Sequence, residues 1–266
     1  MFVSIDESAI YSPPSRRRDC PAAWNVMTEL PPALDGLAAR SVDALRDAVV
    51  RHGKVCYASS LGPESIVLTD MIWMQAPSIE IFTVDTGRLY PQSHELIERL
   101  QHRYGRRIKI YSPEATAVES WIERHGINGF RDGREQRLGC CAARKIAPFR
   151  RAVAGFSAWV TGIRTDQSAS RALARSIEWD DIHRLHKVSP LLDWRDTDVW
   201  AYIHARALPY HRLHDAGYPS IGCAPCTRAI QPGDDPRSGR WWWEEGSSRE
   251  CGLHPRRLDA LVTAEP

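Results

Sequence analysis

The sequence predicts an α/β protein with a doubly wound, mostly parallel sheet, followed by a mobile C-terminal segment. Short buried apolar runs alternate with helical stretches, which is typical of parallel strands covered by helices. Loops of small or charged residues follow several of the strands, at the edge where such sheets bind ligands. The chain ends in a glycine-containing tail that carries a single cysteine, Cys251.

The length allows one large domain or two small ones, and the composition is that of an ordinary globular protein. The chain has 266 residues and a net charge of +2, which indicates no bulk polyanion partner such as a nucleic acid. We expect a partly ordered arm over 1–33, the α/β domain over 34–236 and a flexible segment over 237–266. No run fits a signal peptide, and nowhere do eighteen apolar residues follow one another, so we expect a cytoplasmic protein without a membrane segment.

The first half of the chain contains a helix followed by three strand–helix pairs. Apolar residues at helical spacing predict a helix over 34–52 that stops at Gly53. Buried strands are predicted at 54–58, 79–84 and 107–111, and helices at 66–74, 91–104 and 116–125.

The second half continues this pattern with longer connections. A basic helix is predicted from the Cys140-Cys141 pair to about residue 153, strands over 158–163 and 183–192, and a helix over 197–207. We expect Asp196 to cap that last helix, because a short acidic side chain can accept the free N–H groups of the first turn.

A loop of small residues, 59–65, joins the first strand to the next helix, in the sequence Ser-Ser-Leu-Gly-Pro-Glu-Ser. A strand, a small-residue loop and a helix in this order direct free backbone N–H groups at an anion. Pro63 suits the first helical turn, where a missing N–H costs nothing. The loop is neither a Walker loop nor GxGxxG, so an ordinary tight turn is the alternative to phosphate binding. Asp85 to Arg88 follow the second strand and fall at the same edge.

A second polar loop follows the strand over 158–163. Arg164 and Arg171 flank a stretch rich in hydroxyl and amide groups. Because arginine binds oxyanions bidentately, two such residues at a strand's carboxyl end favour a divalent oxyanion as the ligand.

The seven cysteines indicate metal or thiol chemistry rather than disulfides, because two of them are adjacent and the expected compartment is reducing. Four of them could supply the thiolates of a zinc ion or an iron–sulfur cluster. These four are Cys140, Cys141, Cys223 and Cys226. Adjacent side chains diverge, which favours a cluster with separate iron corners over one tetrahedral ion. The spacing alone leaves cluster, zinc and coincidence open.

Cys251 has cationic residues close in sequence: Arg249, His254, Arg256 and Arg257. Nearby cations favour the thiolate, which is the nucleophilic form of cysteine. A mobile terminal segment could carry such a thiolate to a bound substrate and then present it to a second protein. An unreactive surface cysteine is the alternative for a lone thiol on a tail.

Taken together, these motifs resemble those of the assimilatory adenylyl-sulfate reductases, the iron–sulfur branch of the phosphoadenylyl-/adenylyl-sulfate reductase family, over residues 40 to 254. The matching motifs are Ser59-Ser60-Leu61-Gly62, Asp85-Thr86-Gly87-Arg88, Cys140-Cys141-x-x-Arg144-Lys145, Gly162-x-Arg164-x-Asp166-Gln167-Ser168-x-x-Arg171, Cys223-x-x-Cys226, Arg237-x-x-Arg240-Trp241-Trp242-Trp243 and Glu250-Cys251-Gly252-Leu253-His254. The resemblance implies a fold like that of the adenine-nucleotide α-hydrolases. It also implies reduction of adenylyl sulfate to sulfite and AMP in sulfate assimilation.

The same resemblance implies roles for individual residues. Cys251 would be the nucleophile, passing through an S-sulfocysteine that thioredoxin, a separate protein, would reduce. A [4Fe–4S] cluster would be held by Cys140, Cys141, Cys223 and Cys226. The residues expected to bind the substrate are Ser59, Ser60, Gly62, Thr83, Asp85, Arg88, Lys145, Arg164, Arg171, Arg237, Arg240 and His254.

Other functions remain as alternatives. Glu64 places an acid where a ribose 3′-phosphate would be unwelcome, which favours adenylyl sulfate over its 3′-phosphorylated form, yet the latter stays an alternative substrate. A tRNA-thiolating relative would need a Ser-Gly-Gly-x-Asp-Ser loop, which the chain lacks. A non-catalytic iron–sulfur sensor of nucleotides or redox state is the third possibility. A homo-oligomer is compatible with the sequence, and Arg137 has no role in any of these interpretations.

Overall fold

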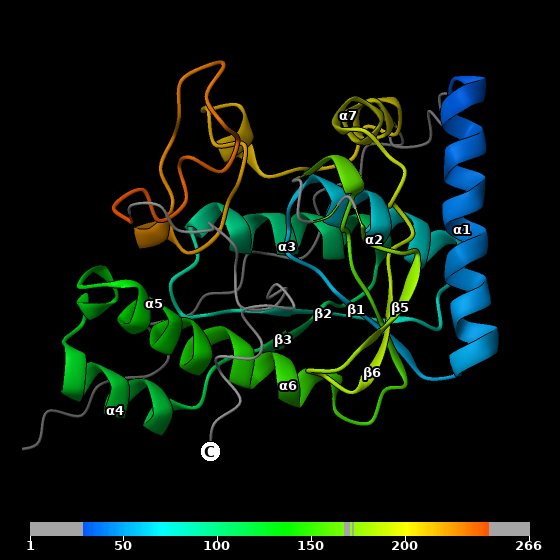
Figure 1. The fold of residues 1–266 in the computed structure, drawn as a ribbon. Coiled ribbons are helices and arrows are strands. Elements are labelled where there is room, and N and C mark those ends of the chain that lie inside the picture. The colour runs from blue at the N-terminus through cyan, green and yellow to red at the C-terminus, as the bar shows by residue number, and fades with distance from the viewer. Residues whose placement is uncertain (1–28, 168–170, 172, 245–266) are drawn as a thin grey trace, which may run out of the picture.

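The computed structural model describes residues 29–167, 171 and 173–244, and it confirms the doubly wound α/β class. One six-stranded sheet has the strand order β3-β2-β1-β4-β6-β5 (Figure 1). All neighbouring strands are parallel except β5, which pairs antiparallel with β6. The expectations for most of the N-terminal arm, and for Cys251 and His254, lie outside the described residues.

The strands are β1 (Val55–Ala58), β2 (Glu80–Val84), β3 (Lys109–Tyr111), β4 (Ala158–Val160), β5 (Ile177–Asp180) and β6 (Leu185–Val188). The α-helices of the described part are α1 (Pro32–His52), α2 (Pro63–Gln75), α3 (Pro91–Tyr104), α4 (Ala115–His125), α5 (Arg134–Cys141), α6 (Ala147–Val153) and α7 (Asp196–Ala205). Within that part, no helix combines the length and the apolar character needed to cross a bilayer.

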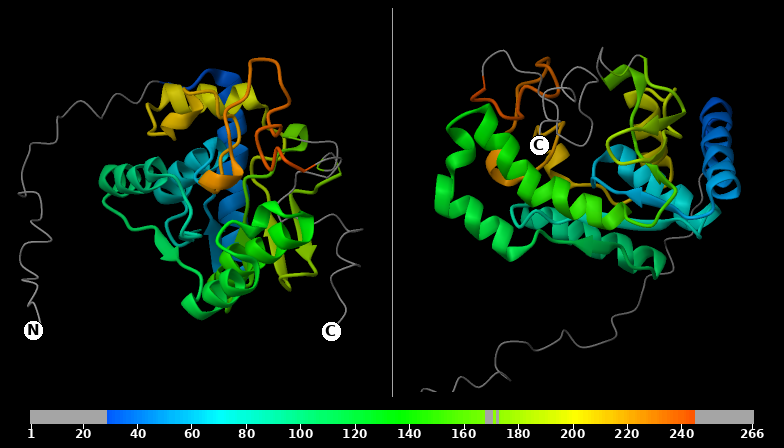
Figure 2. Two further views of the ribbon diagram at one scale, coloured as in Figure 1. Left: turned by 90° about the vertical axis from the view of Figure 1, so that its left-hand side faces the viewer. Right: turned by 60° about the horizontal axis from the view of Figure 1, so that its bottom comes forward.

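The pleat of the strands divides the sheet into two apolar faces. On β1, Val55 and Tyr57 join a large core formed with α1, α2, α3 and α7, whereas Cys56 points to the opposite face. On that second face, Phe82 and Trp159 pack against Phe149 of α6. Helices therefore cover both sides of the sheet (Figures 1 and 2), as alternation of side chains along each strand requires.

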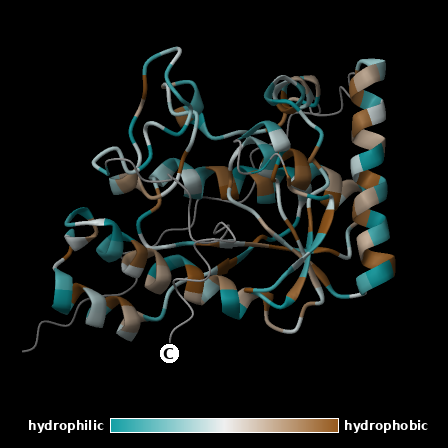
Figure 3. Cartoon of the chain, in the orientation of Figure 1, coloured by the Kyte–Doolittle hydropathy of each residue, from teal (hydrophilic) through white to brown (hydrophobic). Residues whose placement is uncertain are grey.

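The helices differ in how much of their surface is apolar, and this difference decides how deeply each helix is buried in the fold. In α2 every residue from Ser65 to Trp73 is buried, which fits a helix that is apolar on all sides. In α1 the buried residues recur at helical spacing from Leu34 to Ala48, and the remaining faces are polar. Figure 3 shows the corresponding hydrophilic bands along α1 and hydrophobic residues along the strands.

The basic helix predicted after the adjacent cysteines is interrupted. A π-helical turn, Ala142–Ile146, separates α5 from α6. Pro148 explains the break, because proline has no N–H to donate to the carbonyl of Arg144. The wider turn therefore begins directly after Cys141.

Two other sequence predictions are wrong in detail. The strand expected over 183–192 is only Leu185–Val188, and the preceding strand β5 was not predicted. Asp196 does not cap α7: Arg195 is the N-cap residue, and its N–H donates to Asp198 (2.9 Å). Asp196 instead contacts Arg164 from the first turn of the helix.

A buried carboxylate links three helices of the larger core. Asp70 of α2 accepts hydrogen bonds from the hydroxyls of Tyr104 of α3 (2.5 Å) and Tyr202 of α7 (2.7 Å). Burial and the charge of Asp70 raise the pKa of both tyrosines, so both hydroxyls remain protonated donors.

Replacing Tyr202 by phenylalanine is expected to lower the free energy of unfolding by about 1.5 kcal/mol, because a buried charge loses one of its donors. Urea denaturation measures the change. Tyr210→Phe is the matched control, since the Tyr210 hydroxyl donates to Asp215 in an exposed pair. We expect that control to change stability by less than about 0.5 kcal/mol. Equal effects would contradict a special role for the carboxylate between the helices.

Candidate functional site

A large cavity lies at the carboxyl ends of β1, β2 and β4. Strand β1 has β2 on one side and β4 on the other, so the chain order reverses at this point. A crevice forms at such a reversal in doubly wound sheets and is their usual ligand site. The cavity measures about 970 Å³ and extends from the 59–65 loop to the four cysteines. It is large enough for a nucleotide.

The loop after β1 is closed by its own serines. The N–H of Ser60 donates to the Ser65 hydroxyl (3.0 Å), and the two serine hydroxyls lie 2.9 Å apart. Leu61 adopts φ of 62°, a left-handed conformation that turns the loop towards the helix. The start of α2 borders the cavity. The first N–H groups of a helix have no partner within the helix, so they can bind an anion there.

The end of β4 approaches α2 so closely that only glycine fits. A Cβ atom on Gly162 would lie 2.8 Å from the Cβ of Glu64. This contact places Arg164, two residues further on, beside the start of α2.

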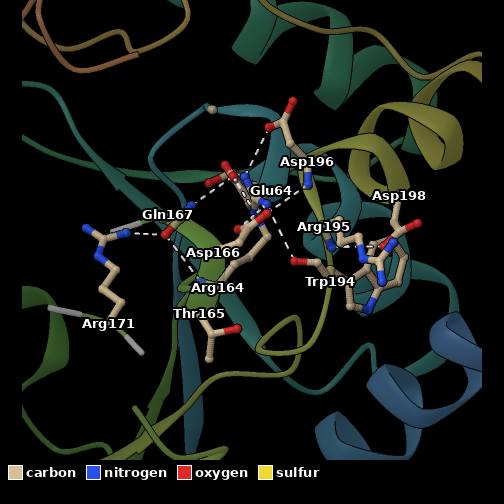
Figure 4. A network of polar contacts seen from close by, with 12 residues as sticks. Glu64, Arg164, Thr165, Asp166, Gln167, Arg171, Trp194, Arg195, Asp196 and Asp198 are labelled. Atoms are coloured by element: carbon tan, nitrogen blue, oxygen red, sulfur yellow. Dashed lines mark hydrogen bonds and ion pairs between the residues drawn. The ribbon is translucent and has the colours of Figure 1, made fainter. Parts of the chain in front are cut away.

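Arg164 is the centre of a network of polar contacts (Figure 4). Its Nε donates to Glu64 Oε1 (2.9 Å), and its other two nitrogens donate to Asp166 (2.6 Å) and Asp196 (3.0 Å). Gln167 donates to the same Glu64 oxygen (2.8 Å), and its own amide oxygen accepts from Arg171. The network joins the loop after β4 to the starts of α2 and α7.

These contacts argue against Arg164 as a direct ligand of an anion. Its side chain is 5% exposed, and three carboxylates already balance its charge. Burial, and the negative charges of Glu64 and Asp166, raise the pKa of Asp196, and Arg164 opposes this. Arg164 therefore holds the walls of the cavity together, and Arg171 is the second arginine of this loop that lines it.

Replacing Arg164 by glutamine is expected to lower the free energy of unfolding by about 3 kcal/mol, because Glu64 and its acidic neighbours lose their shared cation. Asp166→Asn is the matched control, since the Asp166 side chain is 41% exposed and one carboxylate fewer relieves repulsion. We expect that control to cost no more than about 1 kcal/mol. Urea denaturation of both variants measures this. Similar losses in the two variants would contradict the central role of Arg164.

The predicted substrate-binding residues in and after β2 divide into two groups. Thr83 lines the cavity, but its hydroxyl donates to the Ser59 carbonyl (2.8 Å) and so ties β2 to the loop. Asp85 does not line it: its carboxylate accepts from the Gly87 N–H (2.8 Å) and lies 2.7 Å from His94. Arg88 lines it while donating to Asn128 and lying over the ring of Phe130.

The four cysteines come together at one end of the cavity. Cys140 and Cys226 are buried in a small aromatic cluster with Trp121, Phe130 and Trp241, and Cys223 packs against it. The Cys223–Cys226 turn is held by the N–H of Ala224, which donates to the Arg88 carbonyl (2.8 Å), and by that of Trp241, which donates to the Cys226 carbonyl (3.2 Å). None of these four cysteines forms a disulfide with a described residue, and all four line the cavity.

The sulfurs influence one another electrostatically. Burial, together with the negative charges of the three other cysteines, raises the pKa of Cys226 to about 12. Burial also raises the pKa of Cys140, against the opposing charges of Arg144 and Arg88. Buried thiols of this kind become thiolates when a positive group binds them. In the described part of the chain, no three His, Cys, Asp or Glu side chains converge on the position of one metal ion.

Two buried arginines lie beside the cysteines without a carboxylate. Arg144 donates to the Thr86 carbonyl (3.0 Å) and lies next to Cys140. Arg240 lies against Gly222 and over the ring of Trp241, at 4.6 Å. No carboxylate of the residues that the structure describes contacts either guanidinium. Because buried charges need counter-charges, these two arginines favour an anionic ligand in the adjoining space.

Sequence reasoning missed several residues of the cavity. Thr86 lies with its hydroxyl 3.1 Å from the Cys223 sulfur. His211 lines the cavity and lies 3.0 Å from the Ser93 hydroxyl; burial lowers its pKa to about 4, so it is neutral at pH 7. Thr86 stands within the motif 85–88 and could have been noticed, whereas no sequence pattern marks His211. Of the predicted residues, Ser59, Ser60, Gly62, Thr83, Arg88, Lys145, Arg164, Arg171, Arg237 and Arg240 line the cavity.

Comparisons with known proteins agree with this arrangement. Residues 54–229 match the family model described as "Phosphoadenosine phosphosulfate reductase domain". The adenosine 5′-phosphosulfate reductase of Allochromatium vinosum is 47% identical over 83% of this chain and 86% of its own. The enzyme of the same name from Burkholderia cepacia is 45% identical over 85% and 91%.

Solved structures show the same fold. The phosphoadenylyl-sulfate reductase of Candida auris, in a phosphate complex, is similar with a TM-score of 0.62 and 26% identity, over 76% of this chain and 98% of that one. The FMN adenylyltransferase of Candida glabrata is similar with a TM-score of 0.51 and 15% identity, over 86% and 82% of the two chains. This second likeness concerns the fold alone.

Proposed function

Because the chain belongs to the phosphoadenosine phosphosulfate reductase domain family, we propose that it reduces adenosine 5′-phosphosulfate to sulfite and AMP, with a thioredoxin as the electron donor. Like the adenosine 5′-phosphosulfate reductases named above, the chain is an oxidoreductase that acts on a sulfur group. The reaction belongs to sulfate assimilation. The thioredoxin, the covalent intermediate and the iron–sulfur cluster are the parts of this proposal that go beyond the family.

One observation carries the proposal: a nucleotide-sized cavity joins a loop suited to phosphate with a four-cysteine site, whose buried arginines have no carboxylate partner among the described residues. The start of α2 would bind the substrate through backbone N–H groups. Arg240, with Lys145, Arg171 and Arg237 along the cavity wall, would neutralise the phosphosulfate. His211 adds no charge, because its lowered pKa leaves it neutral.

The chemistry requires a nucleophile, and Cys251 is the residue we assign to it. The Cys251 thiolate would attack the sulfur of the bound phosphosulfate. The bond between sulfur and the bridging oxygen breaks, AMP leaves with both bonding electrons, and an S-sulfocysteine remains. One thiolate of reduced thioredoxin then attacks the Cys251 sulfur and releases sulfite. The second thioredoxin thiol resolves the mixed disulfide, so thioredoxin leaves oxidised and Cys251 is a thiol again.

The four cysteines fit a [4Fe–4S] cluster. They form no disulfide with one another, interact electrostatically and are set among cations, and the adjacent pair suits a ligand with several corners. Cys140, Cys141, Cys223 and Cys226 would hold the cluster, which would supply a fixed charge distribution next to the substrate rather than the two electrons. Thr86, with its hydroxyl 3.1 Å from Cys223, and Arg144 beside Cys140 would orient and balance these sulfurs.

The choice between adenosine 5′-phosphosulfate and its 3′-phosphorylated form depends less on Glu64 than the sequence indicates. The Glu64 carboxylate accepts from both Arg164 and Gln167, so the protein already balances its charge. Repulsion of a 3′-phosphate by this side chain is therefore weak. The similarity to relatives named adenosine 5′-phosphosulfate reductase is the stronger support for the unphosphorylated substrate.

The test is to incubate purified protein with reduced thioredoxin and each nucleotide, and to measure sulfite. We expect sulfite from adenosine 5′-phosphosulfate at the higher rate. Faster turnover of the 3′-phosphorylated nucleotide would assign that substrate instead, and sulfite from neither would contradict the proposed function.

A further inference from the structure

Arg137 is almost completely enclosed, although no interpretation of the sequence gave it a role. It lies on α5, three residues before Cys140, and its side chain is 1% exposed. Its Nε donates to Glu244 Oε1 (2.5 Å) and a terminal nitrogen donates to Glu244 Oε2 (2.9 Å). The Glu244 side chain is itself 5% exposed. Two parallel hydrogen bonds of this kind fix both the orientation and the distance between α5 and the segment that carries Glu244.

The same guanidinium lies over an aromatic ring. Arg137 is 4.4 Å from the ring centroid of Trp241, and Arg240 contacts this ring at 4.6 Å. Cation–π contacts from two arginines, one on α5 and one next to Trp241 in the chain, therefore hold the indole ring in place. Trp241 also adopts φ of 45°, a left-handed conformation that residues other than glycine rarely adopt without support from their surroundings.

These contacts connect three parts of the proposed site. Arg137 lies one helical turn before Cys141, and the charges of the two residues interact. Through Trp241 it supports Arg240, which lies beside Cys226. Through Glu244 it holds the chain only seven positions before Cys251. In Figure 1 this final described stretch (orange) lies on the same side of the molecule as α5.

We propose that Arg137 is a positioning residue for sulfonyl transfer: by binding Glu244 and stacking on Trp241, it fixes Arg240 and the point from which the chain leads to Cys251. This rests on the proposed function, because it concerns the step in which Cys251 attacks. Seven extended residues span at most about 25 Å, so a fixed Glu244 limits the volume that the thiol can occupy. A smaller volume raises the effective concentration of the thiol at the substrate.

The test measures the rate of sulfonyl transfer to Cys251 separately from the affinity for the nucleotide. Protein is mixed with adenosine 5′-phosphosulfate without reductant, and the rate at which the peptide containing Cys251 gains the mass of SO₃ is followed by mass spectrometry. Affinity for AMP is measured by calorimetry, because AMP lacks the sulfonyl group. We expect Arg137→Gln and Glu244→Gln each to slow transfer at least about tenfold while the AMP dissociation constant changes less than about twofold.

Two further variants separate positioning from stability. The double variant Arg137→Gln with Glu244→Gln should be no slower than the slower single variant, because both changes remove one ion pair. Arg137→Lys keeps the charge without the two-point contact, so its rate should lie between those of the wild type and Arg137→Gln. Tyr202→Phe, which weakens the core away from the cavity, should lower the melting temperature and leave the transfer rate unchanged.

Two results would overturn the inference. One is a transfer rate in folded Glu244→Gln, or in folded Arg137→Gln, within twofold of the wild type. The other is equal slowing in Tyr202→Phe, which would mean that lower stability alone explains the effect. A wild-type protein that forms no adduct would instead contradict the proposed function, and the positioning role with it, so the two failures are distinguishable.

Discussion

Cys251→Ser is expected to abolish sulfite release. A serine hydroxyl remains protonated at neutral pH and cannot form the S–S bond of S-sulfocysteine that thioredoxin opens, so we expect turnover to fall at least about 10,000-fold. The measurement is sulfite production from adenosine 5′-phosphosulfate with reduced thioredoxin, together with the mass of the peptide containing Cys251 after exposure to substrate alone.

Binding and fold should survive that substitution. We expect the variant to bind AMP and to show the melting curve of the wild type, because serine differs from cysteine only by oxygen in place of sulfur. Cys56→Ala is the matched control, since Cys56 is buried on the face of the sheet covered by α6 and does not line the cavity. That control should form the SO₃ adduct. If Cys251→Ser still releases sulfite, the protein does not use this nucleophile, and a role as a non-catalytic sensor gains support.

Cys226→Ser is expected to remove the proposed [4Fe–4S] cluster, and with it the brown colour that such a cluster would give the purified protein. A serine oxygen is a poor ligand for iron, and Cys226 is one of the four thiols that the described residues place at the site. Iron and sulfide content, visible absorption and sulfite production would be measured together. We expect activity to fall more than about 100-fold, beyond what removal of a supporting residue of a metal site costs.

Colour and metal content also decide the identity of the metal. A wild-type protein that is colourless and contains zinc would contradict the cluster. Cys56→Ala again provides the control, because it removes a buried thiol without touching the four-cysteine site, and it should retain both iron and colour. Equal loss of iron in the two variants would mean that instability, not ligation, explains the effect.

Much of the fold could be predicted because local sequence patterns determine most of its helices and strands. Short, continuous apolar runs marked strands β1 and β2, and a longer apolar run over 66–74 marked the helix α2. Strand β5 was missed because it is short and only half buried, so its residues carry no clear alternation. The break at Pro148 was missed although proline is visible, because a π turn and the end of a helix have the same sequence signal.

The sequence by itself determined which residues are available for chemistry: the small-residue loop after β1, the arginines after β4, and the two cysteine pairs, all of which line one cavity. Only the tertiary structure decided how charges are paired. Arg164, expected to hold an anion, instead holds three carboxylates, whereas Arg144 and Arg240 remain without one among the described residues. The physical reason is separation along the chain. Arg137 and Glu244 are 107 residues apart, and hydrophobic periodicity records whether a side chain is buried but not which partner meets it there.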